Sequence, residues 1–284
     1  MTKYIEFNGI TFGAKNWVDK DDGQRIYTPY IITVFSENDV TCNSQKDDLI
    51  VDGAVFSNFR YDSRIMSLRG YILPRNGERI EELRADLFTK INGKTNKKLI
   101  YFDGEKKFFC HCFADAPVVS GKIKESVEFN INFTVPDFYW YEFLKTEIPV
   151  CTRINHIETE FRLPTVFTTR IAEATINNPN NFNLYPIIKI IAGSTSESET
   201  LEVLNDTTGE SVVLSGYTLN ANEIVTIDCK TLDADASGVS VINYLNDFSD
   251  FSLIPGSNHL ICTNARLGSM LTVAIEYYRP YIGI

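Results

Sequence analysis

The chain has 284 residues and a formal net charge of −10 at pH 7, which argues against a duplex-DNA binder that relies on clustered Lys and Arg. Apolar residues make up 44% of the chain, so a sizeable core is available, and the length favours two domains. No run approaches the roughly 20 apolar residues of a membrane span, and residues 1–6 lack the apolar stretch of a signal peptide, so we expect folding in the cytoplasm.

The first part of the chain predicts short strands separated by polar stretches. A polar, hairpin-like turn is expected at residues 19–23, and residues 36–48 are mostly polar, which is typical of an exposed loop or an extended arm. The strands predicted around these stretches are 4–7, 26–35, 49–55 and 64–73.

One helix is predicted over about residues 76–92. Asn76 is a suitable N-cap, Glu78 would lie in the first turn, where the helix dipole favours an acid, and Gly93 is a natural stop. Apolar residues then recur at helical spacing on one face: Ile80, Leu83, Leu87, Phe88 and Ile91.

The strongest strand signal follows the helix. Residues 98–102 and 108–113 predict two strands joined through a turn at Asp103-Gly104. From Ser126 to Val135 apolar and polar residues alternate strictly, and Pro136, which cannot donate to a sheet ladder, ends the run. Residues 1–143 therefore predict a first domain, a mostly antiparallel β-structure (a split barrel or sandwich) with one helix packed against it.

The rest of the chain is also rich in predicted strands. Residues 144–172 are interpreted as a linker or transition that is interrupted by Pro149 and Pro164 and includes a possible strand at 165–171. Residues 173–284 show short strands at near-regular spacing with turn signals between them, which predicts a second, all-β domain with a sandwich fold.

The segment Cys110-His111-Cys112 has the residue types of a metal site. In a strand, however, the two Cys side chains face one side and His111 the other, so they cannot converge on one tetrahedral ion. We interpret the two as small apolar core residues. In a reducing compartment we expect free thiols at all six cysteines: Cys42, Cys110, Cys112, Cys151, Cys229 and Cys262.

No catalytic or cofactor-binding motif is complete. His156 and His259 have no nucleophile motif near them and are interpreted as surface residues. Gly93-Lys94-Thr95 lacks the upstream glycine of a phosphate loop, and Gly121-Lys122 is followed by Ile123, which has no hydroxyl group. An acidic group is interpreted as solvated turn residues: Asp228, Asp233, Asp235, Asp247 and Asp250. We assign no catalytic, metal or cofactor residue and expect no enzymatic activity.

The order of these stretches resembles the distal tail protein (Dit) family of long-tailed, non-contractile phages of Gram-positive bacteria. The likeness spans nearly the whole chain, and its specificity lies in the order and spacing of the stretches. In the first domain they are 64–72, 99–104 and 135–138, and in the second 185–190, 205–210, 224–228, 253–258 and 273–283.

The resemblance implies a function as well as a fold. It implies a ring, usually a hexamer, built by the first domain with an arm that reaches a neighbour. The second domain would be a galectin-like β-sandwich that docks receptor-binding or other baseplate proteins. Further implied partners are the tail tube protein and the tail-associated lysin or tail fibre hub protein, at the virion tail tip, with DNA passing through the ring unbound and no membrane contact.

Two other functions are weighed against this hub. A carbohydrate-binding module would need a Trp that stacks on the sugar, but Trp17 and Trp140 both lie in the first domain. A glycosidase would need two of the grouped Asp carboxylates to flank a sugar site, whereas Asp is a routine turn residue. The expected function is therefore a structural hub with no cofactor.

Overall fold

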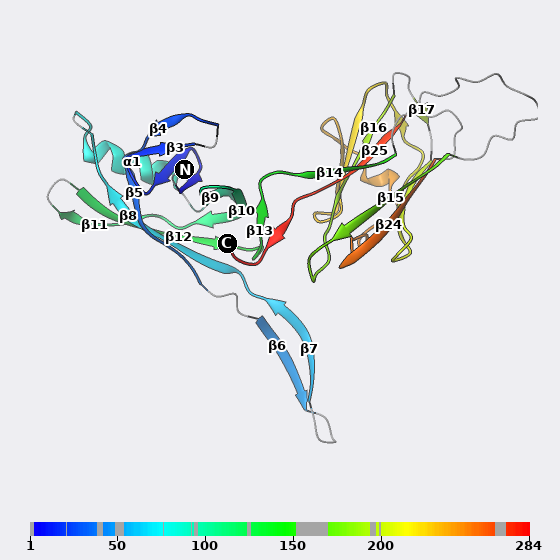
Figure 1. The fold of residues 1–284 in the computed structure, drawn as a ribbon, viewed down its shortest axis with the longest axis horizontal. Helices are drawn as coiled ribbons and strands as arrows, with labels where there is room; N and C mark the ends of the chain where they lie inside the picture. Colours follow the sequence, from blue (N-terminus) through cyan, green and yellow to red (C-terminus); the bar gives the residue numbers. More distant parts are fainter. Residues whose placement is uncertain are drawn as a thin grey trace, which may run out of the picture. The chain divides into compact units, whose positions relative to one another are not determined.

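Two units make up the chain in the computed structural model (Figure 1). The first comprises Met1–Leu144 and Arg279–Ile284, and the second comprises Lys145–Tyr278. Both are mainly β, as predicted from the sequence. The structure describes residues 3–20, 22–38, 42–48, 54–75, 77–91, 93, 96–123, 126–151, 170–193, 197–198, 200–264 and 271–284.

The core of the first unit is a closed barrel. Its strands are β1 (Tyr4–Phe7), β2 (Ile10–Gly13), β5 (Tyr30–Glu37), β8 (Arg64–Ile72), β9 (Lys97–Phe102), β10 (Lys107–Ala114) and β12 (Ser126–Val135). The order runs β12-β8-β5-β2-β1-β9-β10, and β10 pairs back onto β12, which closes the sheet. All pairs are antiparallel except β2–β5, which is parallel.

The remaining strands of this unit lie outside the barrel ring. β11 (Val118–Ile123) pairs with β12, and β13 (Trp140–Glu142) pairs with β10 and with β26 (Pro280–Tyr281). Two hairpins form separate two-stranded sheets: β3 (Trp17–Asp19) with β4 (Arg25–Tyr27), and β6 (Cys42–Asp48) with β7 (Ala54–Tyr61).

The alternating run predicted at residues 126–135 is confirmed as β12, with the same bounds. Its apolar side chains point into the barrel core, and its polar ones are half-buried on the outer face. The side chains buried from this strand are Val127, Phe129, Ile131, Phe133 and Val135.

Other predicted strands are altered at their ends. The expected strand 26–35 is interrupted, because Pro29 has no N–H to donate and separates β4 from β5. Strands β2, β3 and β11 were not predicted. Of the expected strand 49–55, residues 49–53 lie outside the described residues, and β7 runs on to Tyr61.

The single helix, α1, spans Ile80–Lys90 and is shorter than predicted. Asn76 lies outside the described residues. The residue at the N-cap is Arg79, whose side chain makes no capping hydrogen bond, whereas Glu81 and Glu82 supply the expected acids in the first turn. The stop assigned to Gly93 is wrong, because the helix ends at Lys90 and Ile91 is the C-cap with extended backbone.

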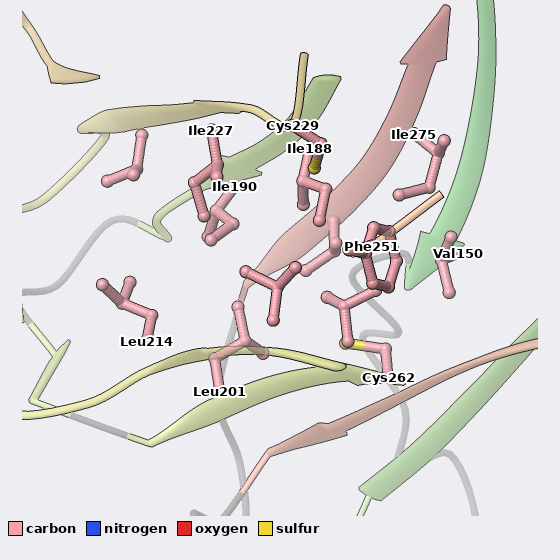
Figure 2. Packing of buried hydrophobic residues seen from close by; sticks show 14 of the residues in the cluster. Val150, Ile188, Ile190, Leu201, Leu214, Ile227, Cys229, Phe251, Cys262 and Ile275 are labelled. Atoms are coloured by element: carbon pink, nitrogen blue, oxygen red, sulfur yellow. The ribbon is translucent and has the colours of Figure 1, made fainter. Parts of the chain in front are cut away.

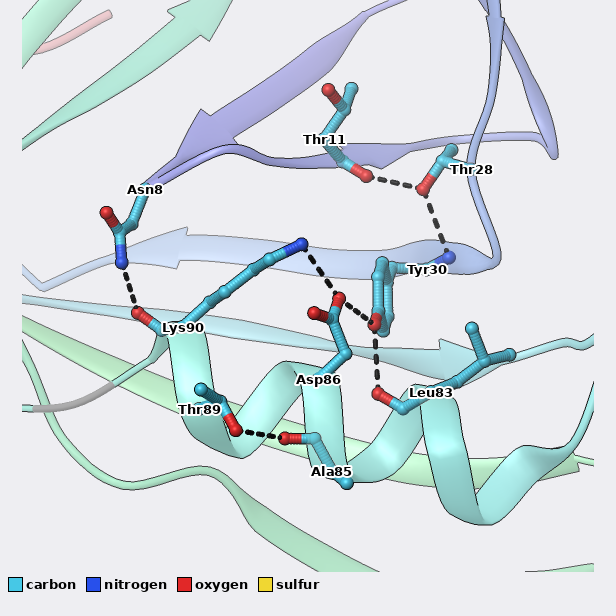
Figure 3. Close-up of polar contacts among 9 residues, drawn as sticks. All are labelled: Asn8, Thr11, Thr28, Tyr30, Leu83, Ala85, Asp86, Thr89 and Lys90. Atoms are coloured by element: carbon cyan, nitrogen blue, oxygen red, sulfur yellow. Dashed lines mark hydrogen bonds and ion pairs between the residues drawn. The ribbon is translucent and has the colours of Figure 1, made fainter.

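Polar contacts from two barrel segments hold α1 in place (Figure 3). The Tyr30 hydroxyl donates to the Leu83 carbonyl at 2.9 Å and to Asp86 Oδ2 at 3.2 Å, and Lys90 Nζ lies 3.0 Å from that Oδ2. At the helix end, Asn8 Nδ2 donates to the Lys90 carbonyl at 2.6 Å, which satisfies an acceptor that the helix itself leaves open.

The second unit is a β-sandwich. One sheet has the order β14 (Thr146–Cys151), β25 (Thr272–Tyr277), β16 (Ile187–Ile191), β21 (Ile224–Asp228), β22 (Asp233–Ala236) and β23 (Val239–Ser240). The other has the order β15 (Arg170–Asn178), β24 (Gly256–Asn264), β18 (Leu201–Asn205) and β19 (Glu210–Leu214). A short pair, β17 (Glu197–Ser198) with β20 (Thr218–Leu219), and one 3-10 turn at Ile242–Tyr244 complete the unit.

Apolar side chains from both sheets fill the sandwich (Figure 2). Ile188 and Ile275 enter from the first sheet, Leu201 and Cys262 from the second, and Phe251 from the connection between the sheets is fully buried. β14 lies inside the stretch expected to be a transition, and of the strand expected at 165–171, residues 165–169 lie outside the described residues. Within the described residues, no helix has the length and apolar character needed to cross a membrane.

Candidate assembly surfaces

The β6–β7 hairpin is the most distinctive surface element of the first unit. It is inserted between barrel strands β5 and β8, and within the described residues its two strands pair only with each other (Figure 1). The polar loop or arm expected at 36–48 is corrected in part: residues 36–37 end β5, and 42–48 are a strand. Among the described residues, no strand covers either outer edge of this hairpin, and such edges can accept a further strand.

A buried charge cluster lies where this hairpin leaves the barrel. Arg64, the first residue of β8, has a side chain that is only 1% exposed, and its Nη1 lies 3.0 Å from Oε2 of Glu37, the last residue of β5. The other oxygen of Glu37 accepts the Trp140 indole N–H at 2.9 Å. Burial raises the pKa of the Glu37 carboxyl, and both partners oppose that rise. We call Glu37, Arg64 and Trp140 the root cluster.

The root cluster was missed in the sequence, although a signal exists. In β8 every second residue faces the core, and Arg64 is in phase with Met66, Leu68 and Ile72. A charged residue in phase with an apolar face needs a buried partner. The sequence does not show which acid supplies it, because Glu37 is 27 residues away in the chain.

A pocket of about 380 Å³ lies on the outer face of the barrel over β5, β8, β11 and β12. Glu128 lies among its lining residues and accepts a hydrogen bond from Ser120 at 3.3 Å. A hydrogen bond to the same carboxylate raises the pKa of Tyr71. The Glu128 carboxylate thus has partners within the pocket, whereas the buried Oδ1 of Asn130 has no hydrogen-bond partner among the described residues. The other lining residues are Thr33, Arg69, Gly70, Val118 and Phe129.

An indole with two guanidinium groups near its ring forms another candidate contact surface, on the β3–β4 hairpin. Trp17 is 41% exposed, and the Cζ atoms of Arg25 and Arg75 each lie 5.6 Å from its ring centroid. The Tyr27 ring packs against Trp17 with centroids 5.7 Å apart. Trp, Tyr and Arg are the residue types that dominate the binding energy of many protein interfaces.

Of the Asp residues grouped in the second unit, interpreted from the sequence as turn residues, Asp228 ends β21, Asp233 and Asp235 lie in β22, and Asp247 and Asp250 lie in the connection before β24. Asp228 Oδ1 accepts the N–H groups of Lys230 and Thr231 at 2.9 and 3.2 Å. The other carboxylates that accept a nearby backbone N–H are Asp233, Asp235 and Asp247. For Asp247 these hydrogen bonds, from Ser249, lower the pKa. Such contacts stabilise turns, and each occupies the oxygen Oδ1.

The structure also shows where several of the histidine and cysteine residues considered in the sequence analysis lie. His259 lies in β24 with its Nε2 3.3 Å from Glu173 and its Nδ1 3.6 Å from Asp206, whereas His156 lies outside the described residues. In β10, Cys110 and Cys112 point into the barrel core while His111 is exposed, so the predicted strand geometry is confirmed. The side chains of Lys94 and Lys122 lie outside the described ones.

A buried carboxylate with two lysine partners lies on the outer face of the larger sheet in the second unit. Glu276 is 6% exposed, and its oxygens lie 2.6 Å from Lys145 Nζ and 3.2 Å from Lys189 Nζ. Burial works to raise the pKa of Glu276, but the hydrogen bonds from Lys145 and Lys189 outweigh it and hold the pKa below its ordinary value.

This carboxylate predicts an acid-sensitive contribution to stability. Because the pKa of Glu276 is lower in the folded than in the unfolded chain, its contribution is complete above the unfolded pKa and is lost as the pH falls through the folded one. We expect Glu276→Gln to lower the melting temperature at pH 7 and to flatten its decline toward pH 4. Thermal unfolding followed by circular dichroism across this range checks it. Glu210→Gln, at an exposed carboxylate, should leave the profile unchanged, and an unaltered profile in Glu276→Gln would contradict the prediction.

Sequence comparisons match both halves of the chain. Residues 28–135 match the family model described as the phage tail protein RIFT-related domain. Residues 179–281 match the model described as the siphovirus-type tail component, C-terminal domain. The first match lies within the barrel unit, the second covers most of the sandwich and extends to residue 281 in the segment that returns to the first unit, and together they span most of the chain. None of the curated proteins matches the chain.

Solved structures share the fold over nearly the full length. The crystal structure of the Dit protein (gp 19.1) of phage SPP1, described as a paradigm of the hub adsorption apparatus in phages that infect Gram-positive bacteria, has a TM-score of 0.63 at 11% identity, covering 98% of this chain and 99% of that one. A chain of the phage P2 baseplate in its activated conformation with Ca has a TM-score of 0.53 at 11% identity, covering 97% of each chain.

Proposed function

This chain belongs to the siphophage distal tail protein (Dit) family of structural tail hubs, and we propose that it performs this work by closing with copies of itself into a ring, a hexamer, at the distal end of the tail tube. The observation that carries the proposal is the β6–β7 hairpin, which within the described residues pairs with no barrel strand. An isolated hairpin is marginally stable in water, so a partner that covers its edges would supply the stabilising contacts that two strands alone do not make.

A ring requires a particular kind of contact. Each copy must present two different, mutually complementary surfaces, because in a head-to-tail interface one surface of each copy contacts the other surface of the next, and the ring closes when the rotation between copies divides a full turn. The hairpin is one such surface, and open strand edges accept a neighbour by main-chain hydrogen bonds. In this proposal the hairpin is the arm that reaches the next copy.

The distribution of charge supports different roles for the two units. The first unit carries 20 Lys and Arg against 21 Asp and Glu, a net charge of −1, whereas the second carries 7 against 16, a net charge of −9. A nearly neutral ring unit offers DNA phosphates few binding sites, which supports passage of DNA without specific binding. The acidic sandwich is suited to partners with basic contact surfaces.

The sandwich is the docking platform in this proposal, galectin-like in fold and placed at the virion tail tip. Its partners are receptor-binding or other baseplate proteins, while the ring contacts the tail tube protein and the tail-associated lysin or tail fibre hub protein, after synthesis in the host cytoplasm. A carbohydrate-binding module is not favoured. Both Trp residues of the chain lie in the first unit, so no indole of the sandwich can stack on a sugar. A structural hub of this kind has no catalytic residue.

The ring is tested by the mass of the assembly. The full-length protein, with and without the tail tube protein and the tail-associated lysin, is examined by light scattering and electron microscopy. We expect closed rings, and we expect their loss when residues 40–61 are replaced by a short Gly/Ser turn, since the hairpin supplies one of the two complementary surfaces.

Two controls keep this test specific. Tryptophan fluorescence shows whether the barrel of the shortened variant still unfolds cooperatively, and Tyr185→Ala, at an exposed residue of the other unit, should assemble normally. A wild-type protein that forms no closed assembly with either partner present would overturn the proposed function. A shortened variant that still forms rings would remove the hairpin from the interface.

A further inference from the structure

The hairpin is attached to the barrel through two short connections. Four residues separate Glu37, the end of β5, from Cys42, the start of β6, and two residues separate Tyr61, the end of β7, from Arg64, the start of β8. Such short connections leave the hairpin little freedom if Glu37 and Arg64 are themselves held. Whatever fixes these two residues therefore restricts the positions that the start of the hairpin can take.

The root cluster holds both residues from several sides. The Arg64 guanidinium binds Glu37 through Nη1 and donates to the carbonyl of Ile282, in the segment that follows β26, through Nη2. The Glu37 carboxylate in turn accepts the indole N–H of Trp140, which is fully buried. One further backbone bond, from Asn38 N–H to the Ile65 carbonyl at 3.1 Å, continues the pairing by a step beyond β5.

This arrangement is better suited to fixing the orientation of the hairpin than to stabilising the fold. A buried ion pair is weak grounds for stability, because removing both charges from water costs about as much as their attraction returns. The Arg64 Nε atom is buried and has no partner among the described residues, which adds to that cost. Planar guanidinium and carboxylate groups, however, fix the angle between the elements that carry them in a way that apolar side chains do not.

We propose that Glu37 and Arg64 are positioning residues for ring assembly, which hold the start of the β6–β7 hairpin so that it meets a second copy of this chain preorganised. This inference rests on the proposed function and adds the residues that prepare its interface. Holding the hairpin before contact lowers the ordering cost that association would otherwise carry.

The test uses the full-length double variant Glu37→Gln/Arg64→Met. It removes both charges together, so no unpaired charge stays buried, and Gln keeps an acceptor for the Trp140 indole. The matched control is Glu6→Gln/Lys20→Met, which removes another ion pair of the same unit, 2.7 Å long with side chains 21% and 26% exposed, away from the hairpin. A second control, Ile131→Val, weakens the barrel core without touching the cluster.

Two readouts are measured well below the unfolding temperature of every variant. For the root-cluster variant we expect the protein concentration at half-assembly to rise at least tenfold, and the Asn38 amide to exchange with solvent at least tenfold faster, while β12 amides stay protected. Both controls should assemble like the wild type. Equal assembly of the root-cluster variant and the wild type would overturn the inference, and so would equal weakening in Ile131→Val, because assembly would then follow stability alone. A wild-type protein that forms no ring contradicts the proposed function instead, and unchanged Asn38 exchange contradicts the positioning role by itself.

Discussion

Replacing Gly70 with alanine is expected to lower the free energy of unfolding of the barrel unit by about 3 kcal/mol. Gly70 lies in the second half of β8, two residues before its end, at a position that faces the core. A methyl group there would overlap the carbonyl oxygen of Ile31 in β5 and would lie 2.8 Å from Cζ of Phe129 in β12. The Ile31 carbonyl is backbone and Phe129 is buried, so relief requires the strands on both sides of Gly70 to separate.

Tryptophan fluorescence during urea unfolding measures this effect selectively, because both tryptophans, Trp17 and Trp140, lie in the first unit. The control is Gly283→Ala in the same unit, where a methyl group would meet no atom within 4 Å and stability should be unchanged. If Gly70→Ala unfolds at the same urea concentration as Gly283→Ala, the close approach of β5 to β8 described here is incorrect.

The second large effect is expected at Asn258 in the sandwich. Asn258 is fully buried in β24, and its Oδ1 accepts the Ile254 N–H at 2.9 Å and Asn205 Nδ2 at 3.2 Å. Its Nδ2 donates to the carbonyls of Ile254 at 2.8 Å and Gly256 at 3.1 Å. Asn258→Ala removes all four hydrogen bonds, one of them to the buried Asn205 amide, and we expect a loss of about 3 kcal/mol.

The readout for Asn258→Ala is thermal unfolding by circular dichroism alongside tryptophan fluorescence. The dichroism transition should move to lower temperature, whereas the fluorescence transition of the barrel should stay in place. Asn177→Ala is the matched control, because Asn177 is an exposed asparagine on the neighbouring strand β15. Equal melting temperatures for the two variants would contradict the buried amide network.

The agreement between predicted and observed elements depends on how local the sequence pattern of each element is. β12 was predicted with its correct bounds because ten residues alternate without a break. Strands β2 and β3, with four and three residues, are too short for a period to emerge, yet β2 pairs within the barrel and β3 pairs with β4 in a separate hairpin. α1 begins at Ile80 with Arg79 as its N-cap, three residues beyond the predicted cap at Asn76, which shows that a favourable capping residue does not by itself set a helix start.

The candidate assembly surfaces, too, could be predicted only where their signal is local in the sequence. The polar stretch at 36–48 identified the region of the hairpin from composition alone, but its pairing with β7 depends on residues 54–61, which were assigned to no full strand. The root cluster joins residues 37, 64 and 140 and donates to the carbonyl of residue 282, and contacts between residues so far apart in the chain leave no periodic pattern in the sequence.

The sequence by itself determined the mainly β character of both units, the phase of the core strands and the family to which the chain belongs, because these follow from local alternation and from the order of the elements. Only the tertiary structure decided that the sheet closes into a barrel, that residues 279–284 return to the first unit, and that Glu37 meets Arg64 at the start of the hairpin. Closure and buried pairing depend on contacts between residues far apart in the chain, and the energies that select them arise only when those residues leave water together.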